Sequence, residues 1–386
     1  MKMTDSPRWD EHHAAWRDPR HVVNFSTGDL HARADFTTQI TGPFWDLVEQ
    51  LGVTILVSRE YEHLLVALTV RDGRPHMTYL PLPHPSGITV DLADGRVWVA
   101  CTRNPNQILE LRPTNLDAGN GPQPTLVPAS ARFLPGRTYL HDLALINGVI
   151  HANSVGSNSV IRVTAASVDR VWWPRSIEAK GVPDFERNYL QLNSIAAGPS
   201  LAGSYFTASA VTPSSRRPGH RNFAVDRRGA LFSGMTREPV AFGLTRPHSA
   251  RFQDNRVWLD NSGYGEFGCV DGDRFVPLVR LPGWTRGLTF CQGYALVGTS
   301  RVIARFRDYA PGLDVDTARC GLHWVELSSG RCVASLTWPA GNQIFAIETL
   351  PAARVGGLPY RADGRGTKRA FKLFYAFEFS EKGATE

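Results

Sequence analysis

Six short segments of the chain place polar residues directly before an apolar run. They read HPSGITV (84–90), YLHDLAL (139–145), QLNSIAA (191–197), RPHSARF (246–252), WTRGLTF (284–290) and QIFAIET (343–349). Each has a polar pair or cluster, then a small or acidic anchor residue, and then a stretch typical of a β-strand. The anchors are Gly87, Asp142, Ser194, Ser249, Gly287 and Ala346, at intervals of 55, 52, 55, 38 and 59 residues.

Two sets of side chains in these segments are candidates for chemistry. Because side chains alternate along a strand, residues one and three positions before each anchor share a face. One position before the anchors stand Ser86, His141, Asn193, His248, Arg286 and Phe345. Three positions before them stand His84, Tyr139, Gln191, Arg246, Trp284 and Gln343. A structural strand would carry Val or Ile at such sites, so the pattern predicts a polar funnel.

The residue types in this funnel predict acid–base chemistry on an anion. We assign catalytic roles to four residues: His141 as general base, Asp142 or else a neighbouring carboxylate as the group that orients it, His248 as general acid, and Arg286 as the positive charge for a carboxylate, phosphate or developing oxyanion. The ends of the strands that follow the segments add further polar groups. We therefore expect substrate contacts from Tyr139, Gln191, Asn193, Arg246, Asn261, Trp284, Gln343, Arg103 and Asn153.

A metal centre is the alternative for the same residues. His84, His141 and His248 come from three of the six segments. Three neutral imidazoles with an open fourth position are a usual arrangement for catalytic zinc or iron. The sequence therefore leaves two possibilities: no cofactor, or one divalent metal, Zn or Fe. The metal-free mechanism needs only residues at equivalent positions of the repeat.

The rest of the chain is typical of an all-β protein. Strand-like runs such as 53–58, 64–70 and 294–299 are bounded by Asp-Gly, Asn-Gly and Ser-Gly pairs, which favour tight hairpins. Only 44–51 has a helical pattern. The first five segments are each followed by a second strand: RVWVACT, GVIHANS, GSYFTAS, RVWLDNS and GYALVGTS. A strand at a fixed point, its hairpin partner and two weaker strands make one β-propeller blade.

Six copies predict a six-bladed propeller, with seven blades as the alternative if the two ends of the chain form more than one unit. A β-sandwich would not place one motif at the start of every fourth strand. We expect the strands from 53–82 to complete the blade begun by QIFAIET, which closes the ring, and AFKLFYAFEF (370–379) follows the sixth copy. The expected organisation is a polar arm at 1–42, a single propeller at 43–380 and a tail at 381–386.

Composition limits the partners. The net charge of +6 comes from dispersed Arg with no motif for nucleic acid, so we expect no nucleic-acid partner. Five cysteines without C-x-x-C spacing are typical of reduced thiols. No stretch approaches 18 apolar residues and the N-terminal segment has no apolar core, so we expect no membrane partner and a cytoplasmic location. The expected state is a monomer or homodimer.

Several segments also carry a family resemblance. LHDLALINGV, QLNSIA, PHSARFQDNRVWLDNSGYGEFGCVD, PGWTRGLTF, GYALVGTS and RCGLHWVELSSG resemble a bacterial family of conserved hypothetical proteins, classified only as a domain of unknown function. The similarity runs from about Gly52 to Leu350. It implies a propeller-like fold and supplies no activity.

The functional expectation is a small-molecule enzyme that works in the central funnel. Lyase, cyclase, isomerase and hydrolase chemistry all remain open, on a small-molecule or peptide substrate that the arginines predict to be anionic, in bacterial specialised metabolism. The alternative is a propeller that binds a ligand or a protein without catalysis, because binding propellers use similar funnels.

Overall fold

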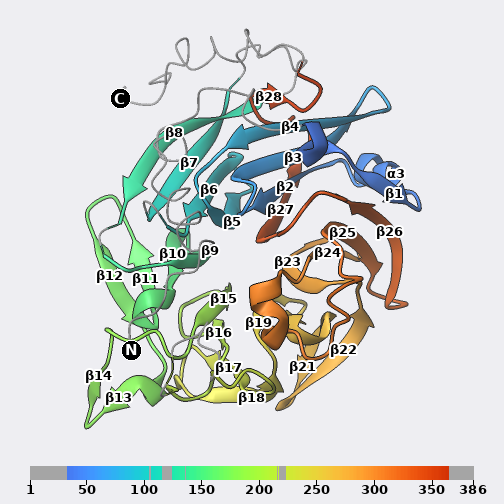
Figure 1. The fold of residues 1–386 in the computed structure, drawn as a ribbon. Coiled ribbons are helices and arrows are strands. Elements are labelled where there is room, and N and C mark those ends of the chain that lie inside the picture. Colours follow the sequence, from blue (N-terminus) through green and yellow to red (C-terminus); the bar gives the residue numbers. More distant parts are fainter. Residues whose placement is uncertain are drawn as a thin grey trace, which may run out of the picture.

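The computed structural model describes residues 33–103, 106–114, 124–134, 136–214, 216 and 223–364. Six antiparallel sheets stand around a common axis, as the ring in Figure 1 shows. The innermost strand of each sheet packs against the innermost strands of its two neighbours, all the way round. The described part of the chain is therefore a six-bladed propeller, which confirms the predicted all-β fold and blade number.

The first three blades follow one another along the chain. The first contains β5 (Pro85–Asp91), β6 (Arg96–Cys101), β7 (Gln107–Thr114) and β8 (Thr125–Phe133). The second contains β9 (Leu140–Ile146), β10 (Val149–Ser154), β11 (Ser159–Val163) and β12 (Val168–Trp172). The third contains β15 (Leu192–Ala196), β16 (Tyr205–Ala208), β17 (Gly229–Ser233) and β18 (Pro239–Leu244). A small ribbon of β13 (Glu178–Ala179) and β14 (Val182–Pro183) lies between the second and third.

The fourth blade contains β19 (Pro247–Gln253), β20 (Arg256–Asn261), β21 (Glu266–Asp271) and β22 (Arg274–Arg280). The fifth contains β23 (Trp284–Cys291), β24 (Tyr294–Ser300), β25 (Gly321–Glu326) and β26 (Arg331–Thr337), with β1 (Gln39–Thr41) as a fifth strand at its outer edge. Of the predicted arm, residues 39–41 thus belong to a blade, and residues 1–32 lie outside the described residues.

The sixth blade joins the two ends of the chain. Its inner strand β27 (Ala346–Pro351) pairs with β2 (Val53–Arg59), from Ser58 opposite Ala346 to Val53 opposite Pro351. The strands β3 (Leu64–Arg71), β4 (Arg74–Pro81) and β28 (Tyr360–Arg361) complete it. The predicted closure of the ring by the N-terminal strands is confirmed. The run at 370–379 lies outside the described residues.

The helices in the described part of the chain are short and lie outside the sheets. The predicted helix is present as α3 (Phe44–Gln50), which packs its buried Phe44 and Val48 against the sheets. The other turns of helix in the described residues are η2 (Arg33–Phe36), η3 (Val155–Ser157), η4 (Arg175–Ile177), η5 (Ser262–Tyr264) and η6 (Ala304–Tyr309). Of these, η3 and η6 contribute residues to the cavity described below.

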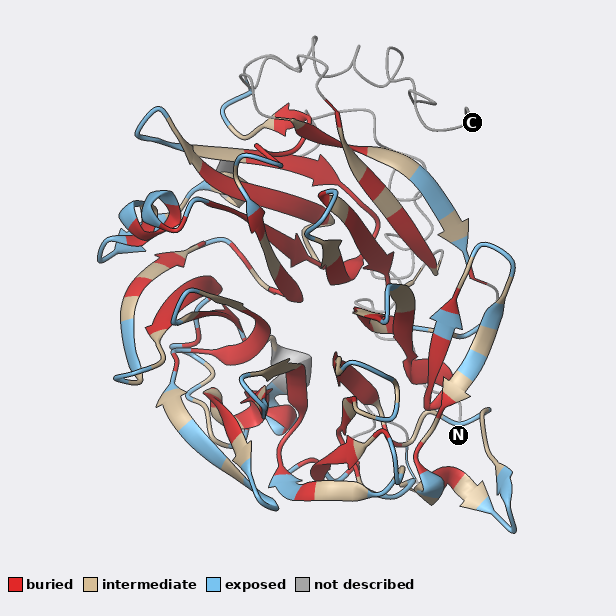
Figure 2. Cartoon of the chain, turned by 180° about the vertical axis from the view of Figure 1, so that it is seen from behind, coloured by how far each residue is buried: buried red, intermediate tan, exposed pale blue. Residues whose placement is uncertain are grey.

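Residues become less buried from the inner to the outer strands of the blades. Inner strands are buried along most of their length, whereas the outermost strands β8 and β22 alternate with exposed positions (Figure 2). The inner strands approach closely: a Cβ on Gly87 would lie 2.6 Å from the backbone of Asp142 in the next blade. A glycine at this anchor therefore lets two neighbouring blades pack their first strands together.

Candidate functional site

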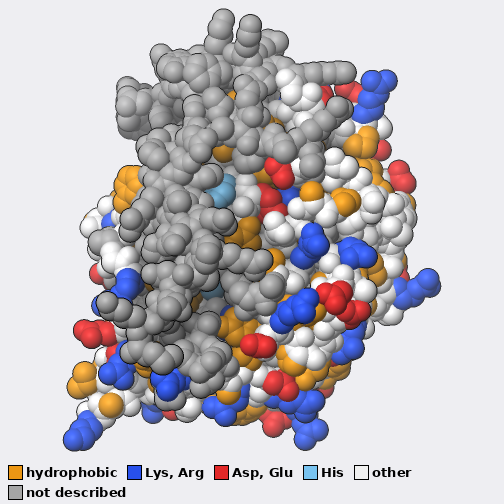
Figure 3. Space-filling view, viewed as in Figure 1, with side chains coloured by type: hydrophobic (Ala, Val, Ile, Leu, Met, Phe, Trp, Pro, Cys, Tyr) orange, Lys and Arg blue, Asp and Glu red, His pale blue; other side chains and the backbone are white. Residues whose placement is uncertain are grey.

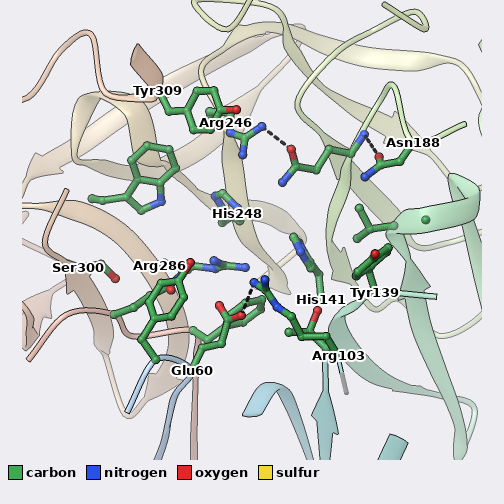
Figure 4. A pocket seen from close by; sticks show the side chains of 18 of the residues that line it. Glu60, Arg103, Tyr139, His141, Asn188, Arg246, His248, Arg286, Ser300 and Tyr309 are labelled. Atoms are coloured by element: carbon green, nitrogen blue, oxygen red, sulfur yellow. Dashed lines mark hydrogen bonds and ion pairs between the residues drawn. The ribbon is translucent and has the colours of Figure 1, made fainter. Parts of the chain in front are cut away.

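A cavity of about 490 Å³ opens where the inner strands begin and the second strands end. Every blade contributes to it, directly or through the loop before its inner strand. The residues that carry its polar chemistry include Glu60, Arg103, Arg246, Arg286, His141 and His248, which Figure 4 shows pointing into a common space. The predicted position of the funnel, at the strand starts on the propeller axis, agrees with this cavity.

Four of the six residues three positions before the anchors share an unusual backbone. Tyr139, Gln191 and Arg246 all have φ between 48° and 55°, and His84 has φ 47°. A left-handed conformation is uncommon for residues other than glycine, and it concentrates at functional sites. The turn it creates directs Tyr139, Gln191 and Arg246 to the cavity, where Trp284 and Gln343 join them. His84 is the exception and does not line it.

The residues one position before the anchors are aimed by β-bulges. The register between inner and second strand shifts at the anchor in five blades, for example between His248 and Arg251 in β19. Bulges next to active sites redirect side chains. His141, His248, Arg286 and Phe345 line the main cavity, whereas Asn193 lies beneath them, at a smaller cavity.

Asp142 has a structural position that the sequence did not predict. Its Oδ1 accepts the Leu143 N–H at 3.0 Å, and its Oδ2 accepts the Ile195 N–H at 3.0 Å and Arg251 Nη1 at 3.1 Å. It does not line the main cavity. Its carboxylate is therefore used to join three blades, and the predicted role of orienting His141 is corrected.

Two predicted contact residues also lie away from the main cavity. Asn261 accepts the Thr245 N–H at 2.7 Å and donates to Glu266 Oε2 at 2.8 Å, so its amide fixes the connection between blades. Asn153 is fully buried and lines no described cavity. Arg103, in contrast, reaches the main cavity and donates to Glu60 Oε1 at 2.7 Å. The prediction that residues at the ends of the second strands contact the substrate thus places one of these three residues, Arg103, in the cavity.

The predicted triad of His84, His141 and His248 is not brought together. His84 lies at the side of the site, with its ring centroid 4.3 Å from that of His63 and its Nδ1 3.7 Å from Glu60 Oε1. Within the described residues, no group of three or more His, Cys, Asp or Glu side chains is arranged to hold a metal ion. Arg246 and Arg286 beside the two cavity histidines also make the location electrostatically unsuited to a cation.

The two deep arginines have neutral partners. Arg246 donates to Gln191 Oε1 and lies over the Tyr309 ring, 4.3 Å from its centroid. Arg286 lies over the Phe345 ring, 3.2 Å from its centroid. When the Gln343 amide is oriented with its nitrogen toward Glu60 and its oxygen toward Arg286, Arg286 Nη1 donates to that oxygen at 2.7 Å. Neither arginine forms an ion pair with a carboxylate of the described residues, although both are at least 90% buried.

Those cations have a direct effect on the histidines. Burial, then the charges of Arg286 and Arg246, hold the pKa of both His141 and His248 well below the usual value. Burial likewise lowers the pKa of the arginines, to about 10, so they remain charged at neutral pH. The site therefore combines neutral imidazoles with two buried guanidinium groups that no carboxylate of the described residues contacts directly, while Glu60, which pairs with Arg103, attracts Arg286 from farther away.

The tautomer of His248 follows from its hydrogen bonds. Ser262 Oγ donates its proton to the Thr285 carbonyl at 2.6 Å, and the same oxygen lies 2.9 Å from His248 Nδ1. A hydroxyl has one proton, so Nδ1 must be the donor in the second contact. The neutral ring consequently carries its proton on Nδ1 and leaves Nε2 as a base.

Some lining residues were not among the predicted site residues. Glu60 and Tyr61 follow β2, which is the second strand of the sixth blade. The sequence predicted both that β2 belongs to this blade and that the ends of second strands carry site residues, so the two predictions together would have found them. Tyr309 comes from η6, inside the long insertion of the fifth blade. No repeat position marks it, so sequence reasoning had no signal for it. Asn188 and Tyr189 precede β15 in a similar loop.

Outside the cavity, charge is scattered. The described surface in Figure 3 intersperses Lys and Arg with Asp and Glu side chains. In the cavity lining, by contrast, six arginines face two glutamates. No helix in the described part of the chain is long and apolar enough to span a membrane.

Comparison with known proteins places the sequence in a family. A model described as a domain of unknown function, DUF4915, matches residues 42–358. The chain belongs to this family. The DUF4915 match confirms the resemblance that the sequence motifs carried. No curated protein matches the sequence.

Solved structures give the DUF4915 chain a fold comparison only. The crystal structure of a nidogen/laminin complex is 10% identical, with a TM-score of 0.53 over 78% of this chain and 100% of that one. Virginiamycin B lyase from Staphylococcus aureus is 12% identical (TM-score 0.39; 78% and 99% covered), and a gluconolactonase from Xanthomonas campestris is 12% identical (0.44; 75% and 86%). At these values the nidogen/laminin match supports the architecture, and the two enzymes carry no argument.

Proposed function

We propose that this protein is an enzyme that binds a small organic carboxylate in the central cavity and transfers a proton on it, as a lyase or isomerase. The observation that carries this proposal is the pair Arg246 and Arg286. Each is buried, charged and held by an amide and an aromatic face instead of a carboxylate. Arg251, in contrast, is neutralised: it lies 3.1 Å from Asp142 and 3.4 Å from Glu348.

Buried charge without a partner is costly, so an arrangement that keeps it calls for an anionic ligand. The aromatic rings stabilise the guanidinium groups without cancelling their charge. A carboxylate that reaches both arginines receives charge-assisted hydrogen bonds, and the same charges stabilise the enolate that forms when a neighbouring carbon loses a proton.

His248 is the proposed base. Its Nε2 carries the lone pair because Nδ1–H is held by Ser262. In the absence of ligand, burial and then the charges of Arg286 and Arg246 keep the pKa of His248 low, which makes it a weak base. A bound carboxylate offsets their charge, raises the pKa of His248 and so prepares the base only when substrate is present. This gives His248 the role that the sequence analysis gave to His141, and His141 becomes the acid.

Deuterium exchange tests the proposal directly. The full-length protein is incubated in D₂O with acetate, 2-hydroxy acids, hexuronates and arylacetates such as phenylacetate, and loss of the proton on the carbon next to the carboxylate is followed by NMR. We expect exchange with at least one of them, and a loss of about 10²-fold or more in His248→Asn. The matched control is His323→Asn, since His323 is also buried but lies between strands, bonded to Thr299 and Ser335.

Binding without catalysis is the second candidate, because the arginine pair by itself requires only an anion. It predicts carboxylate binding that depends on Arg246 and Arg286, no exchange with any compound, and no effect of His248→Asn beyond affinity. That combination of results would replace the enzymatic proposal.

A further inference from the structure

A second, very small cavity lies directly beneath the two histidines. Its volume is about 10 Å³. His141, His248, Arg286 and Phe345 line both this cavity and the main one, so they form the layer that separates the two. Asn193 and Arg251 are among the residues that line only the lower one.

Three buried polar atoms around this cavity make no hydrogen bond of normal distance and angle within the described residues, although the Asn193 amide is close enough to the His141 ring to oppose part of the lowering of the His141 pKa. They are Arg286 Nη2, Asn193 Oδ1 and His141 Nδ1. Buried polar atoms are nearly always paired, with protein or with water, and an unpaired one costs about 1–3 kcal/mol. Three of them at one small cavity require a common explanation.

The orientation of the Asn193 amide is fixed by its other contacts. Its Nδ2 donates to Ser209 Oγ and to the Pro247 carbonyl, both at 2.9 Å. Both protons of the amide nitrogen are therefore used, and Oδ1 is the atom left for the cavity. Arg286 is similarly constrained, because its Nη1 is held by Gln343 and its face by Phe345.

We propose that this cavity binds one ordered water molecule that is a permanent part of the site. The volume fits a single water, and buried waters typically make about three hydrogen bonds. Arg286 Nη2 donates to the water, and the water donates one proton to Asn193 Oδ1 and the other to His141 Nδ1. All three unpaired atoms are then satisfied, and both protons of the water are used.

This arrangement determines the tautomer of His141. A ring nitrogen that accepts a proton from water is unprotonated, so the neutral His141 carries its hydrogen on Nε2. His248 has the opposite tautomer because of Ser262. The two histidines at the floor thus offer one donor and one acceptor. The water site stands without the proposed function, whereas its part in making His141 the acid rests on that function.

Two measurements on the full chain test the water site. A high-resolution crystal structure of the wild type is expected to show one water within hydrogen-bonding distance of Arg286 Nη2, Asn193 Oδ1 and His141 Nδ1. Nitrogen-15 NMR of the imidazoles is expected to show Nε2–H for His141 and Nδ1–H for His248. An empty cavity, an ion in place of the water, or Nδ1–H at His141 would overturn the proposal.

The variant Asn193→Leu adds a perturbation. It removes one acceptor and fills the space, so the water should be lost and the His141 tautomer should become mixed, while His248 keeps Nδ1–H. Unchanged tautomers at both rings would count against the water. If this variant does not fold, the wild-type crystal and NMR results still decide. Neither readout depends on turnover, so absence of enzymatic activity would disprove the proposed function and leave this test intact.

Discussion

Ser262 Oγ and His248 Nδ1 lie 2.9 Å apart, in a chain of hydrogen bonds that ends at the Thr285 carbonyl. The contact with His248 lies within the fourth blade, the hydrogen bond to Thr285 reaches the start of the fifth, and together they leave Nε2 as the unprotonated nitrogen of the imidazole. The proposed role of His248 as base therefore depends on a residue that does not line the main cavity.

Replacing Ser262 by Ala should disturb the base and leave anion binding in place. The Nδ1–H of His248 loses its acceptor, so the NMR signals should show a mixture of tautomers, and turnover should fall by about 10-fold or more while KM stays similar. A buried donor without a partner also costs about 1–3 kcal/mol of stability. Ser157→Ala is the matched control, since Ser157 occupies η3, a turn that follows β10 as η5 follows β20. A single Nδ1–H tautomer in Ser262→Ala would contradict the assignment.

Arg286→Met should not destabilise the ligand-free protein. The substitution removes a buried charge that has no carboxylate partner and keeps an apolar chain over Phe345. Stability in urea is expected to be equal to the wild type or about 1–3 kcal/mol higher. Arg251→Met should instead lose about 3–5 kcal/mol, because it leaves Asp142 and Glu348 without their cation. Similar losses in both variants would show that Arg286 is neutralised within the protein.

Asp142→Asn separates structural from catalytic roles. The carboxylate joins β9, β15 and β19, so its loss is expected to lower the free energy of unfolding by about 3–5 kcal/mol. The folded fraction should retain ligand affinity within a few-fold. Calorimetric unfolding and ligand titration measure the two quantities. A stable variant that has lost all activity would restore the catalytic role predicted from the sequence.

Stability at low pH should depend on His141 and His248. Both have a pKa well below 6.5 in the folded state, so between that value and pH 6.5 the unfolded chain binds more protons, and stability falls as pH decreases. Each histidine contributes up to about 1.4 kcal/mol per pH unit in this range. Burial raises the pKa of Glu348 to about 7, so below pH 7 this carboxyl binds more protons in the folded than in the unfolded chain. Its contribution to stability therefore increases as the pH falls toward the pKa of the unfolded state, opposite to that of the histidines. The test therefore compares the wild type with His248→Asn.

The variant should lose less stability than the wild type between pH 6.5 and pH 5, and a bound carboxylate should reduce the pH dependence of the wild type. Parallel stability curves for the two proteins would show that His248 is not held neutral by its surroundings.

The repeat made the architecture predictable. Its anchors coincide with the inner strands, and the closure by β2 and β27 followed from counting strands at the two ends. Residues such as His141, His248 and Arg286 were found because they occupy equivalent positions of that repeat.

The errors have local causes. Strict alternation fails at a bulge, so the sequence could not tell that Asn193 faces the lower cavity and His84 faces His63. Asp142 was assigned to chemistry because a carboxylate next to a histidine suggests a catalytic pair. Its contacts with Ile195 and Arg251, 53 and 109 residues away, depend on blades that only the fold brings together.

The most direct test of the account compares a carboxylate with its own primary amide. Calorimetric titrations with glucuronate and glucuronamide, and with phenylacetate and phenylacetamide, isolate the charge from the shape of the ligand. We predict that at least one carboxylate binds at least about 10-fold more tightly than its amide, and that the difference disappears in the Arg246→Gln/Arg286→Gln double variant. Equal binding of acid and amide to the wild type, or a preference that survives in the double variant, would contradict the claim that these two arginines form an anion site.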